Sequence, residues 1–382
     1  MDRHDKKERL RIGILFYFSS SWMGGINYII NVIKMLNFLD DKDKPEIILF
    51  FRADLKKFVN EIDYPYLDLV EWHFPSIIKG YLGSWSTCKN VFVNDILHNY
   101  DLNGLYPLHD YPVRTRSNTK LVSWYADLQH IYYPDFFSKL KILERNTRIK
   151  LILKNSDDLI LSSQAVADDF ASCFNMKSTT KIHIFHFASV IDDLSDISIE
   201  KLRDNYKLPF KYFIASNQFY KHKNHKILLN AIAILKKKGI RLHLALTGRL
   251  PEKDNSPYIN EVNDIIGRNL LYDQISFLGV IPRKEQLLLM KHSQCVIQPS
   301  LFEGWSTVIE DAISLQVPVV ASNLPVNIEQ LGKGGVFFDP HDPMQLADIL
   351  INYPERNLED VFYEDYTTRV RNAAESFINI FS

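Results

Sequence analysis

The sequence PSLFEGWSTVIEDA, residues 299–312, joins a short apolar run to a helix through a loop that carries a carboxylate and a glycine. The apolar residues before it, 295–297, predict a buried strand. Thr307 and Glu310 have the spacing of a capping box, in which each side chain accepts a hydrogen bond from the backbone N–H of the other residue. We therefore expect a helix to begin at Thr307, at the carboxyl edge of a parallel sheet.

A helix start of this kind suits a phosphate, because its first N–H groups and the positive end of the helix dipole point out of the sheet. Glu303 lies just before it and would repel a phosphate, so we expect this carboxylate to face hydroxyl groups nearby. A phosphate and hydroxyl groups together predict a site for a nucleotide sugar.

Residues 303–307, EGWST, with an acid eight positions after Glu303, resemble the E-x7-E region of retaining glycosyltransferases of the GT4 type. The resemblance implies that Glu303 contacts the donor sugar and that the second acid holds the ribose hydroxyls. Here the second acid is Asp311, which is one methylene shorter than the usual glutamate. We favour Asp311 over Glu310 for the ribose, because Glu310 serves the capping box and points about 100° away around the helix.

The length and net charge of the chain limit the classes of function that it can have. The chain of 382 residues is long enough for two domains. Its net charge of −1 argues against a nucleic-acid binder that relies on bulk positive charge. No apolar run approaches the roughly 18 residues of a membrane span, and the charged N-terminal residues lead directly into a strand, unlike a signal peptide. We expect a cytoplasmic protein without a nucleic-acid partner.

The three cysteines, Cys88, Cys173 and Cys295, are too widely spaced for a zinc site or a disulfide framework, and we expect them to be buried as small apolar groups. An Asp-x-Asp pattern occurs at residues 41–43, but in a polar turn and not at a strand end. We therefore expect no metal site and metal-independent chemistry.

Strand and helix patterns alternate along the chain, which predicts α/β architecture with mostly parallel sheets. The expected strands cover residues 11–18, 47–51, 67–72, 91–93, 105, 120–124, 159–161, 181–187, 212–216, 242–246, 275–277, 295–297, 317–321 and 335–338. Residues 189–208 are acidic and polar, as expected of a linker. The predicted domains are 1–195 and 205–364.

The resemblance extends over residues 212–340, less closely over 120–137, and little elsewhere. It implies the GT-B fold, in which two Rossmann-like domains face one another across an interdomain cleft. In that arrangement the first domain lies on the acceptor side, the second binds the nucleotide sugar, and the C-terminal helix, here 365–382, packs back on the first domain.

Residues 217–225 follow the first strand of the second domain. The family has an arginine and, five residues later, a lysine that bind the donor diphosphate. Lys223 matches the lysine, whereas Gln218 stands in the place of the arginine, so that Lys221 or Arg249 would have to supply the missing cation. The alternative is that this lysine-rich loop is an ordinary solvated surface.

Three glycine-containing turns carry weaker signals. Gly24 and Gly25 form an expected tight turn between the first strand and a helix over 26–39, and the resemblance places them near the donor. Gly248 ends a strand at the place where, in the family, a glycine approaches the nucleotide. Residues 279–283, which include Ile281, resemble the segment whose backbone contacts the base. Each could equally be a plain turn.

Asp127 and His130 follow a strand of the first domain. Through the resemblance, Asp127 would bind the nucleophilic hydroxyl, and His130 would bind a sugar hydroxyl or phosphate. A histidine beside aromatic residues is about as often a packed core side chain. The pair His109–Asp110 is a second candidate, expected at the surface of a loop. No serine or cysteine motif accompanies either pair, so the sequence does not support a hydrolase with a nucleophilic side chain.

Residues 139–154 predict a basic amphipathic helix. A core-packed helix with a solvated basic face explains this pattern. A face for anionic lipid or for a lipid-linked acceptor is the sharper hypothesis, and it would place the protein at the inner face of a membrane.

The sequence thus predicts a retaining glycosyltransferase of hexosyltransferase type, which moves a sugar from a nucleotide-diphosphate sugar to a hydroxyl of a bacterial-type surface glycan or lipid-linked glycan. No cofactor besides this co-substrate is expected. Asp127, His130 and Glu303 are the expected catalytic residues. The expected donor-binding residues are Gly24, Gly25, Gln218, Lys223, Gly248, Arg249, Ile281, Glu303, Gly304, Trp305, Ser306, Thr307 and Asp311.

Two alternatives stay open. A nicotinamide-dependent oxidoreductase would also use doubly wound sheets, but it needs G-x-G-x-x-G with an acid about 20 residues later, and no segment supplies both. A sugar-nucleotide-binding protein without activity is suggested only by Gln218 and Asp311, where the family has other residues.

Overall fold

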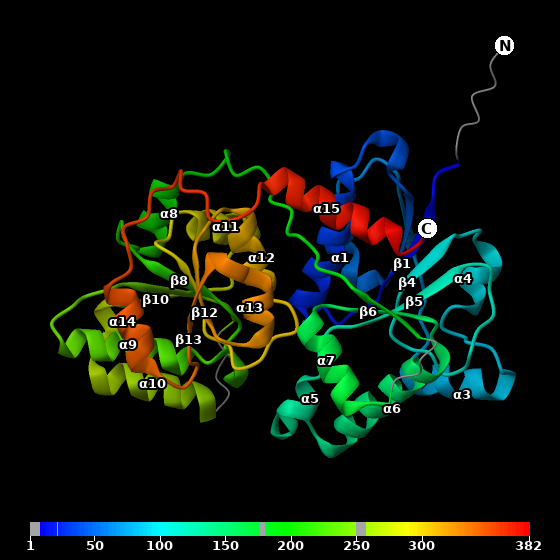
Figure 1. The fold of residues 1–382 in the computed structure, drawn as a ribbon, viewed down its shortest axis with the longest axis horizontal. Coiled ribbons are helices and arrows are strands. Elements are labelled where there is room, and N and C mark those ends of the chain that lie inside the picture. The colour runs from blue at the N-terminus through cyan, green and yellow to red at the C-terminus, as the bar shows by residue number, and fades with distance from the viewer. Residues whose placement is uncertain (1–7, 21, 176–179, 250–256) are drawn as a thin grey trace, which may run out of the picture. The chain divides into compact units, whose positions relative to one another are not determined.

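The computed structural model describes residues 8–20, 22–175, 180–249 and 257–382. They form two compact units. Unit 1 comprises the described residues up to Ala188 together with Thr367–Ser382, and unit 2 comprises those within Ser189–Tyr366. Each unit is considered by itself below (Figure 1).

Unit 1 contains, within the described residues, a sheet of seven parallel strands in the order β3-β2-β1-β4-β5-β6-β7. The strands are β1 (Arg11–Phe16), β2 (Glu46–Phe51), β3 (Leu67–Glu71), β4 (Gly104–Leu108), β5 (Lys120–Tyr125), β6 (Asp158–Leu161) and β7 (Lys181–Ile184). The α-helices are α1 (Met23–Met35), α2 (Lys56–Val59), α3 (Ile77–Thr87), α4 (Asn94–Asn99), α5 (Gln129–Tyr132), α6 (Lys139–Asn155), α7 (Gln164–Cys173) and α15 (Tyr366–Asn379).

The central strands of unit 1 are apolar along their length because helices cover both faces of the sheet. Helices α3, α4, α6 and α7 contribute to a core on one face. The C-terminal helix α15 also belongs to unit 1. The ring of Phe377 lies edge-on to Tyr106 of β4, with 5.6 Å between ring centroids, and tilted against Phe185, at 5.5 Å.

Unit 2 contains, within the described residues, six parallel strands in the order β10-β9-β8-β11-β12-β13. The strands are β8 (Phe213–Ser216), β9 (Leu244–Thr247), β10 (Ile275–Gly279), β11 (Val296–Gln298), β12 (Val319–Ser322) and β13 (Gly335–Phe338). The α-helices are α8 (Ile199–Tyr206), α9 (His225–Lys237), α10 (Pro257–Asn269), α11 (Arg283–Lys291), α12 (Thr307–Ser314), α13 (Pro325–Leu331) and α14 (Pro343–Ile351). Helices α9, α10 and α14 pack on one face, and α8, α11, α12 and α13 on the other.

Both sheets reverse their strand order once. The reversal lies between β1 and β4 in unit 1, and between β8 and β11 in unit 2. In open parallel sheets, ligands bind outside the carboxyl ends of the strands at such a switch point. Each unit therefore has one edge where a site is expected.

The segment expected to be a linker belongs to unit 2. The carbonyl of Ser189 accepts a hydrogen bond from Ser314 Oγ at 2.7 Å, and Ile191 N donates to Tyr366 Oη at 3.1 Å. Residues 199–206 form α8, which begins at the N-cap Ser198. Residues 189–208, expected to link the domains, are thus part of unit 2, because their apolar residues pack on its core.

Residues 91–93 are not a strand. The ring of Phe92 lies against the backbone of Gly80 in α3, and Val93 is the N-cap of α4. The cysteine prediction was also wrong in part, because Cys88 and Cys173 are exposed and only Cys295 is buried.

The first helix of unit 1 begins earlier than expected. Helix α1 starts at Met23, so that Gly24 and Gly25 lie in its first turn and do not form a turn before it. A Cβ atom on Gly25 would lie 2.5 Å from the indole of Trp22. This glycine therefore makes room for the ring of Trp22, the N-cap of α1.

Candidate active site

The switch point of unit 2 carries a chain of polar side chains. Asn217, after β8, donates from Nδ2 to Gln298 Oε1 at 2.9 Å, and Gln298, the last residue of β11, donates from Nε2 to Glu303 Oε1 at 2.7 Å. Glu303 also pairs with Lys223, whose Nζ lies 2.6 Å from Oε1. The loops after the two strands are joined further by Leu301 N, which donates to the carbonyl of His222. The polar chain fixes Glu303 and Lys223 side by side.

The Glu303 carboxylate is ionised in this environment. Burial acts to raise its pKa, but the charge and hydrogen bond of Lys223, with a smaller contribution from Ser300, outweigh burial and hold the pKa below its ordinary value of 4.5. Burial, together with the charge of Lys223, lowers the pKa of the neighbouring His222 to about 4. At neutral pH the cluster therefore holds one cation, one anion and a neutral imidazole.

The depressed pKa of Glu303 predicts a pH dependence of stability. The pKa of Glu303 is lower in the folded state than in the unfolded state. The ion pair therefore contributes fully to stability above the unfolded-state pKa, and this contribution is lost as the pH drops through the folded-state pKa. We expect the difference in unfolding free energy between the native chain and Glu303→Gln to stay constant from about pH 8 to about pH 5 and to shrink only at lower pH. Denaturant titrations across this range measure it, and a difference that shrinks between pH 7 and pH 5 would contradict the assignment.

Hydrogen bonds connect the carboxyl ends of β8, β9 and β10 beside this cluster. Gly248, after β9, has φ +124°, and a Cβ atom on it would lie 2.2 Å from the carbonyl oxygen of Asn217, so only glycine fits. Its N–H donates to Gly279 O at 2.8 Å. Gln218 Oε1 accepts from the N–H of Arg249 at 3.0 Å. Because that bond uses the side-chain oxygen, Gln218 keeps its amide N–H groups for a ligand, while the Arg249 side chain is exposed.

The N-terminus of α12 differs from the expected capping box. The N-cap is Ser306, whose Oγ accepts from Ile309 N at 3.3 Å, one residue earlier than predicted. Thr307 is the first helical residue, and Glu310, fully buried, accepts from Gln330 Nε2 at 2.8 Å. The capping box was therefore wrong, because the neighbouring hydroxyl of Ser306 has the cap position.

Gln330 of α13 also occupies part of the predicted phosphate site. Its Oε1 accepts from Ser306 N at 3.1 Å, so this amide is not available to a phosphate as expected. The described residues provide no hydrogen bond to the N–H groups of Thr307 and Val308. These two amides leave the helix start suited to an anion.

Asp311 is held by an arginine that the sequence analysis did not assign. Arg283, the first residue of α11, donates from Nη1 to Asp311 Oδ2 at 2.7 Å and from Nη2 to Oδ1, which makes a two-bond pair. The Asp311 side chain is 1% exposed, whereas the Arg283 side chain is 33% exposed. A ligand that approaches this place therefore meets the guanidinium before the carboxylate.

The predicted donor residues divide into those that the structure brings together and those that it does not. Unit 2 brings together Gln218, Lys223, Gly248, Arg249, Ile281, Glu303, Gly304, Trp305, Ser306, Thr307 and Asp311 around the carboxyl ends of its strands. Gly24 and Gly25 lie in unit 1. The sequence patterns did not indicate the roles of Gln298, Arg283 and Gln330. A polar residue at the end of a buried strand was a signal for Gln298.

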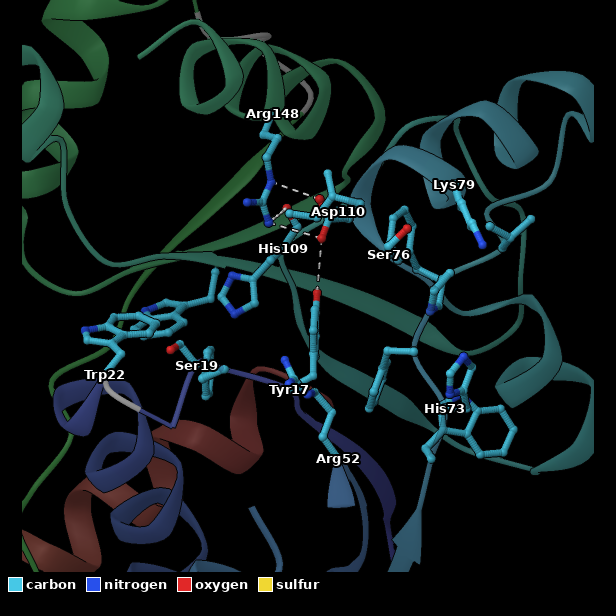
Figure 2. Close-up of a pocket in the computed structure, with 18 of the residues that line it drawn as sticks. Tyr17, Ser19, Trp22, Arg52, His73, Ser76, Lys79, His109, Asp110 and Arg148 are labelled. Atoms are coloured by element: carbon cyan, nitrogen blue, oxygen red, sulfur yellow. Dashed lines mark hydrogen bonds and ion pairs between the residues drawn. The ribbon is translucent and has the colours of Figure 1, made fainter. Parts of the chain in front are cut away.

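Unit 1 has a pocket of about 1550 Å³ at its own switch point (Figure 2). It is lined by the residues after β1, including Tyr17 and Trp22, and by those after β4, including His109. Helices α3 and α6 contribute further lining residues. The pocket belongs to unit 1 alone.

One wall of the pocket is aromatic. Trp22 stacks with Trp124, at 5.9 Å and 14°, while Phe18 meets both rings edge-on. Tyr17 stacks on Phe74 at 4.7 Å. Flat apolar rings beside polar groups suit a sugar, whose ring has apolar C–H faces and hydroxyl edges.

The pair His109–Asp110 is in this pocket, not at the surface of a loop. Asp110 is 2% exposed and pairs with Arg148 of α6, whose Nε lies 2.9 Å from Oδ1. Burial, aided by the charge of Arg148, lowers the pKa of His109 to about 3, so the imidazole is neutral. Within the described residues its Nε2 has no hydrogen-bond partner. The surface prediction failed because Arg148, 38 residues along the chain, neutralises the buried carboxylate.

Asp127 and His130 take different positions. Asp127 lines the pocket, and its Oδ1 accepts from Gln129 N at 3.0 Å. His130 is 1% exposed and its Nε2 bonds with Asn146 Oδ1 at 2.9 Å, as a packed core histidine does. Burial lowers its pKa. His130 is not among the residues that line the pocket.

Among the described residues, His, Cys, Asp and Glu side chains do not gather in groups of three or more that could hold a metal ion. In that same part of the chain, no helix is both long enough and apolar enough to cross a membrane.

The family model described as glycosyl transferases group 1 matches residues 198–370. These residues belong to the glycosyl transferases group 1 family. The match lies over unit 2, where the cluster around Glu303 stands at the switch point, and it gives no support to the nicotinamide-dependent oxidoreductase. The matched region, residues 198–370, thus contains Lys223, Glu303 and Asp311.

Relatives and solved structures extend the comparison. The O-antigen chain mannosyltransferase RfbU of Salmonella typhimurium is 26% identical over 217 residues, which is 56% of this chain and 56% of that protein. The chain spans about half the length of the curated relatives it matches. Sucrose-phosphate synthase from Thermosynechococcus elongatus has a TM-score of 0.68 at 16% identity, over 98% of each chain. HepE of Anabaena, in complex with UDP and glucose, has a TM-score of 0.66 at 18% identity, over 96% of this chain and 98% of that one. The chain therefore has the GT-B fold, as expected.

Proposed function

We propose that the chain transfers a glycosyl group, with retention at the anomeric carbon, from a nucleotide-diphosphate sugar in unit 2 to a hydroxyl acceptor. The observation that carries this proposal is the pair of Lys223 and Glu303 at the β8–β11 switch point, beside the open amides of α12. A cation and helix N–H groups suit a diphosphate, and an ionised carboxylate suits sugar hydroxyls.

The leaving diphosphate and the developing positive charge on the sugar need different partners. The ammonium group of Lys223 has three N–H donors, of which Glu303 takes one, so two are available to the diphosphate. The amides of Thr307 and Val308 add donors fixed in place before the reaction. Glu303 positions the sugar hydroxyls and places negative charge near the forming oxocarbenium ion.

The nucleotide ribose lies beside Arg283 and Asp311 in this proposal. The resemblance assigns the ribose to the second acid. Because the short aspartate is covered by the guanidinium, Arg283 and Asp311 act on the ribose together. Positive charge for the diphosphate comes from the protein, so we propose transfer without a metal ion and with no cofactor besides the co-substrate.

The acceptor binds in the pocket of unit 1, and we propose that it is a surface glycan or a lipid-linked glycan of polysaccharide biosynthesis. Aromatic rings beside charged groups support a carbohydrate there. The relative RfbU is an O-antigen chain mannosyltransferase, which supports this class of acceptor. The protein would then work at the inner face of a membrane, with its basic helix α6 toward anionic lipid.

A panel of UDP-, GDP-, ADP- and CMP-linked sugars tests the function. We expect one nucleotide class to raise the melting temperature, and free nucleotide to be released faster when the acceptor is added. Thermal stabilisation without turnover on any acceptor would favour the non-catalytic binding protein. Stabilisation by nicotinamide dinucleotides alone would overturn the proposal.

His109 is expected to contact the acceptor. His109→Asn keeps a polar atom near Nδ1 but removes Nε2, a buried nitrogen without a hydrogen-bond partner within the described residues, so we expect kcat/KM for the acceptor to fall about tenfold while KM for the donor is unchanged. His109→Gln, which retains a polar group near Nε2, is expected to keep most of the activity. The exposed His98→Asn is a control. Equal losses in His109→Asn and His109→Gln would show a packing role instead.

A further inference from the structure

The pocket of unit 1 extends across several strands of the sheet. Residues at or just after the carboxyl ends of β3, β2, β1, β4 and β5 line it, and these five strands are neighbours in that order. In the same order, the lining includes His73, Arg52, Tyr17, His109 and Asp127. Figure 2 shows Trp22 and His73 on opposite sides of Tyr17. The pocket therefore has two ends, a β5 end and an α3 end, where α3 is the helix that follows β3.

The pocket is larger than one sugar requires. Neighbouring strands of a sheet are about 4.8 Å apart, so the outer strands β3 and β5 are separated by roughly 19 Å. The volume of about 1550 Å³ exceeds the roughly 300–1,000 Å³ of a site for one drug-sized molecule. A hexose in a glycan chain advances by a distance similar to one strand spacing, so the pocket has room for about three or four linked sugars.

Aromatic side chains occur along the whole pocket. At the β5 end, Trp22 and Trp124 stack on each other. In the middle, Tyr17 stacks on Phe74 with 4.7 Å between ring centroids. At the α3 end, Trp72 also lines the pocket. Aromatic side chains suit the apolar C–H faces of sugar rings, so surface of the kind that binds a carbohydrate is not confined to the β5 end.

The α3 end also carries polar side chains that face a ligand. His73, Ser76 and Lys79 line this end, are exposed, and lie on the same side of the pocket in Figure 2. Arg52, in the middle of the pocket, pairs with Asp54 at 3.0 Å, whereas no ion pair within the described residues includes Lys79. The three N–H donors of the Lys79 ammonium group are therefore open to hydroxyl groups of a ligand.

We propose that the α3 end of the pocket is a second sugar subsite, so that the acceptor is an oligosaccharide read over about three or four residues. The orientation of this acceptor rests on the proposed function. The sugar that receives the new residue lies at the β5 end, beside His109 and Asp127, and the preceding sugars extend past Tyr17 toward Lys79. His73 and Lys79 are then specificity-determining residues for acceptor length, and they do not touch the reacting atoms.

The charged groups favour a glycan over an acyl chain as the occupant of the pocket. Lys79 and Asp127 line its two ends, and each needs a polar partner when a ligand displaces water. Sugar hydroxyls supply such partners at every residue of an oligosaccharide. An acyl chain would remove the water from both charges without replacing its hydrogen bonds.

Binding measured against acceptor length tests the second subsite. The full chain is applied to an array of mono- to pentasaccharides of glucose, galactose, mannose, rhamnose and N-acetylglucosamine. The tightest ligand and its shortened forms are then titrated without a donor. We expect the affinity to rise at least tenfold from the terminal sugar to three or four residues and to stay constant for longer chains. The proposal is overturned if no oligosaccharide of three or more residues binds more tightly than its terminal sugar alone.

Substitutions at the α3 end separate the two subsites. His73→Ala/Lys79→Ala is expected to weaken binding of the tetrasaccharide about tenfold and to leave binding of the terminal sugar unchanged. In transfer assays, KM for the long acceptor rises while kcat stays the same. The exposed residues His98 and Lys89 do not line the pocket, so His98→Ala/Lys89→Ala is the matched control. Equal losses for the short and the long acceptor would contradict the subsite.

A monosaccharide that carries a dodecyl chain tests the competing occupant. We expect it to bind no more tightly than the monosaccharide alone. If it bound as tightly as the tetrasaccharide, the α3 end would hold an apolar tail and the proposal would be overturned.

The proposed function can fail separately, because stabilisation by a nucleotide sugar does not involve the α3 end. Length-dependent binding in a chain that no nucleotide sugar stabilises would keep the second subsite and reject the transferase. Stabilisation by a nucleotide sugar, with binding that is independent of acceptor length, would keep the transferase and reject the subsite.

Discussion

Glu303→Gln is expected to lower the rate of glycosyl transfer by at least about 100-fold while the chain stays folded. Glutamine keeps the size of the side chain and a carbonyl that can accept from Lys223, but it removes the negative charge beside the developing oxocarbenium ion. It also leaves the charge of Lys223 unbalanced. Nucleotide release in the presence of acceptor measures the rate, and circular dichroism with thermal unfolding confirms the fold.

Alanine is a poorer test at this position. Glu303 is largely buried between Lys223 and Gln298, so Glu303→Ala would leave a buried ammonium without its partner.

Unit 2 offers a matched control for the pair. Lys226 and Glu261 also form a lysine–glutamate ion pair in unit 2, but at its surface. Glu261→Gln is expected to change neither the rate nor the stability measurably. A Glu303→Gln variant that keeps more than about a tenth of the native rate would contradict the role of the carboxylate in the reaction.

Arg283→Ala is expected to lower the unfolding free energy by about 3 kcal/mol, because it leaves the buried Asp311 carboxylate without its two-bond partner. We also expect the affinity for the nucleotide sugar to fall, since the ribose would lose the guanidinium. Denaturant unfolding measures the first effect, and isothermal titration with the nucleotide measures the second.

The exposed pair of Arg268 and Asp264 is the control, and Arg268→Ala is expected to cost less than about 0.5 kcal/mol. Asp311→Asn/Arg283→Gln removes both charges, so we expect it to recover much of the stability but not the affinity. If this double variant bound the nucleotide as tightly as the native chain, the pair would be structural only.

The sequence was sufficient for the strand–loop–helix unit around residues 295–312 because each of its signals is local. An apolar run of strand length, a loop acid and a helix-start hydroxyl need no partner elsewhere in the chain. The alternation of such units predicted α/β architecture with mostly parallel sheets, and the resemblance assigned both Lys223 and Glu303 to the donor. The main error in this region was the position of the helix cap, which is Ser306, one residue before the predicted Thr307.

What the sequence could not provide are the pairings between distant residues. Arg283 and Asp311 are 28 residues apart, and their pairing depends on how α11 and α12 pack. Likewise, Asp110 reads as a surface residue until Arg148 is brought to it by α6. A buried charge is stable only with its partner, and single-sequence patterns do not identify that partner.

The position of α15 has a consequence for synthesis of the chain. Unit 1 is interrupted: the polypeptide leaves it after Ala188 and returns only at Thr367, with unit 2 made entirely from the intervening residues. On a ribosome, unit 2 therefore emerges whole while Tyr106 and Phe185 still lack the ring of Phe377. The nascent first half must keep this apolar surface from aggregating until its last helix has been translated.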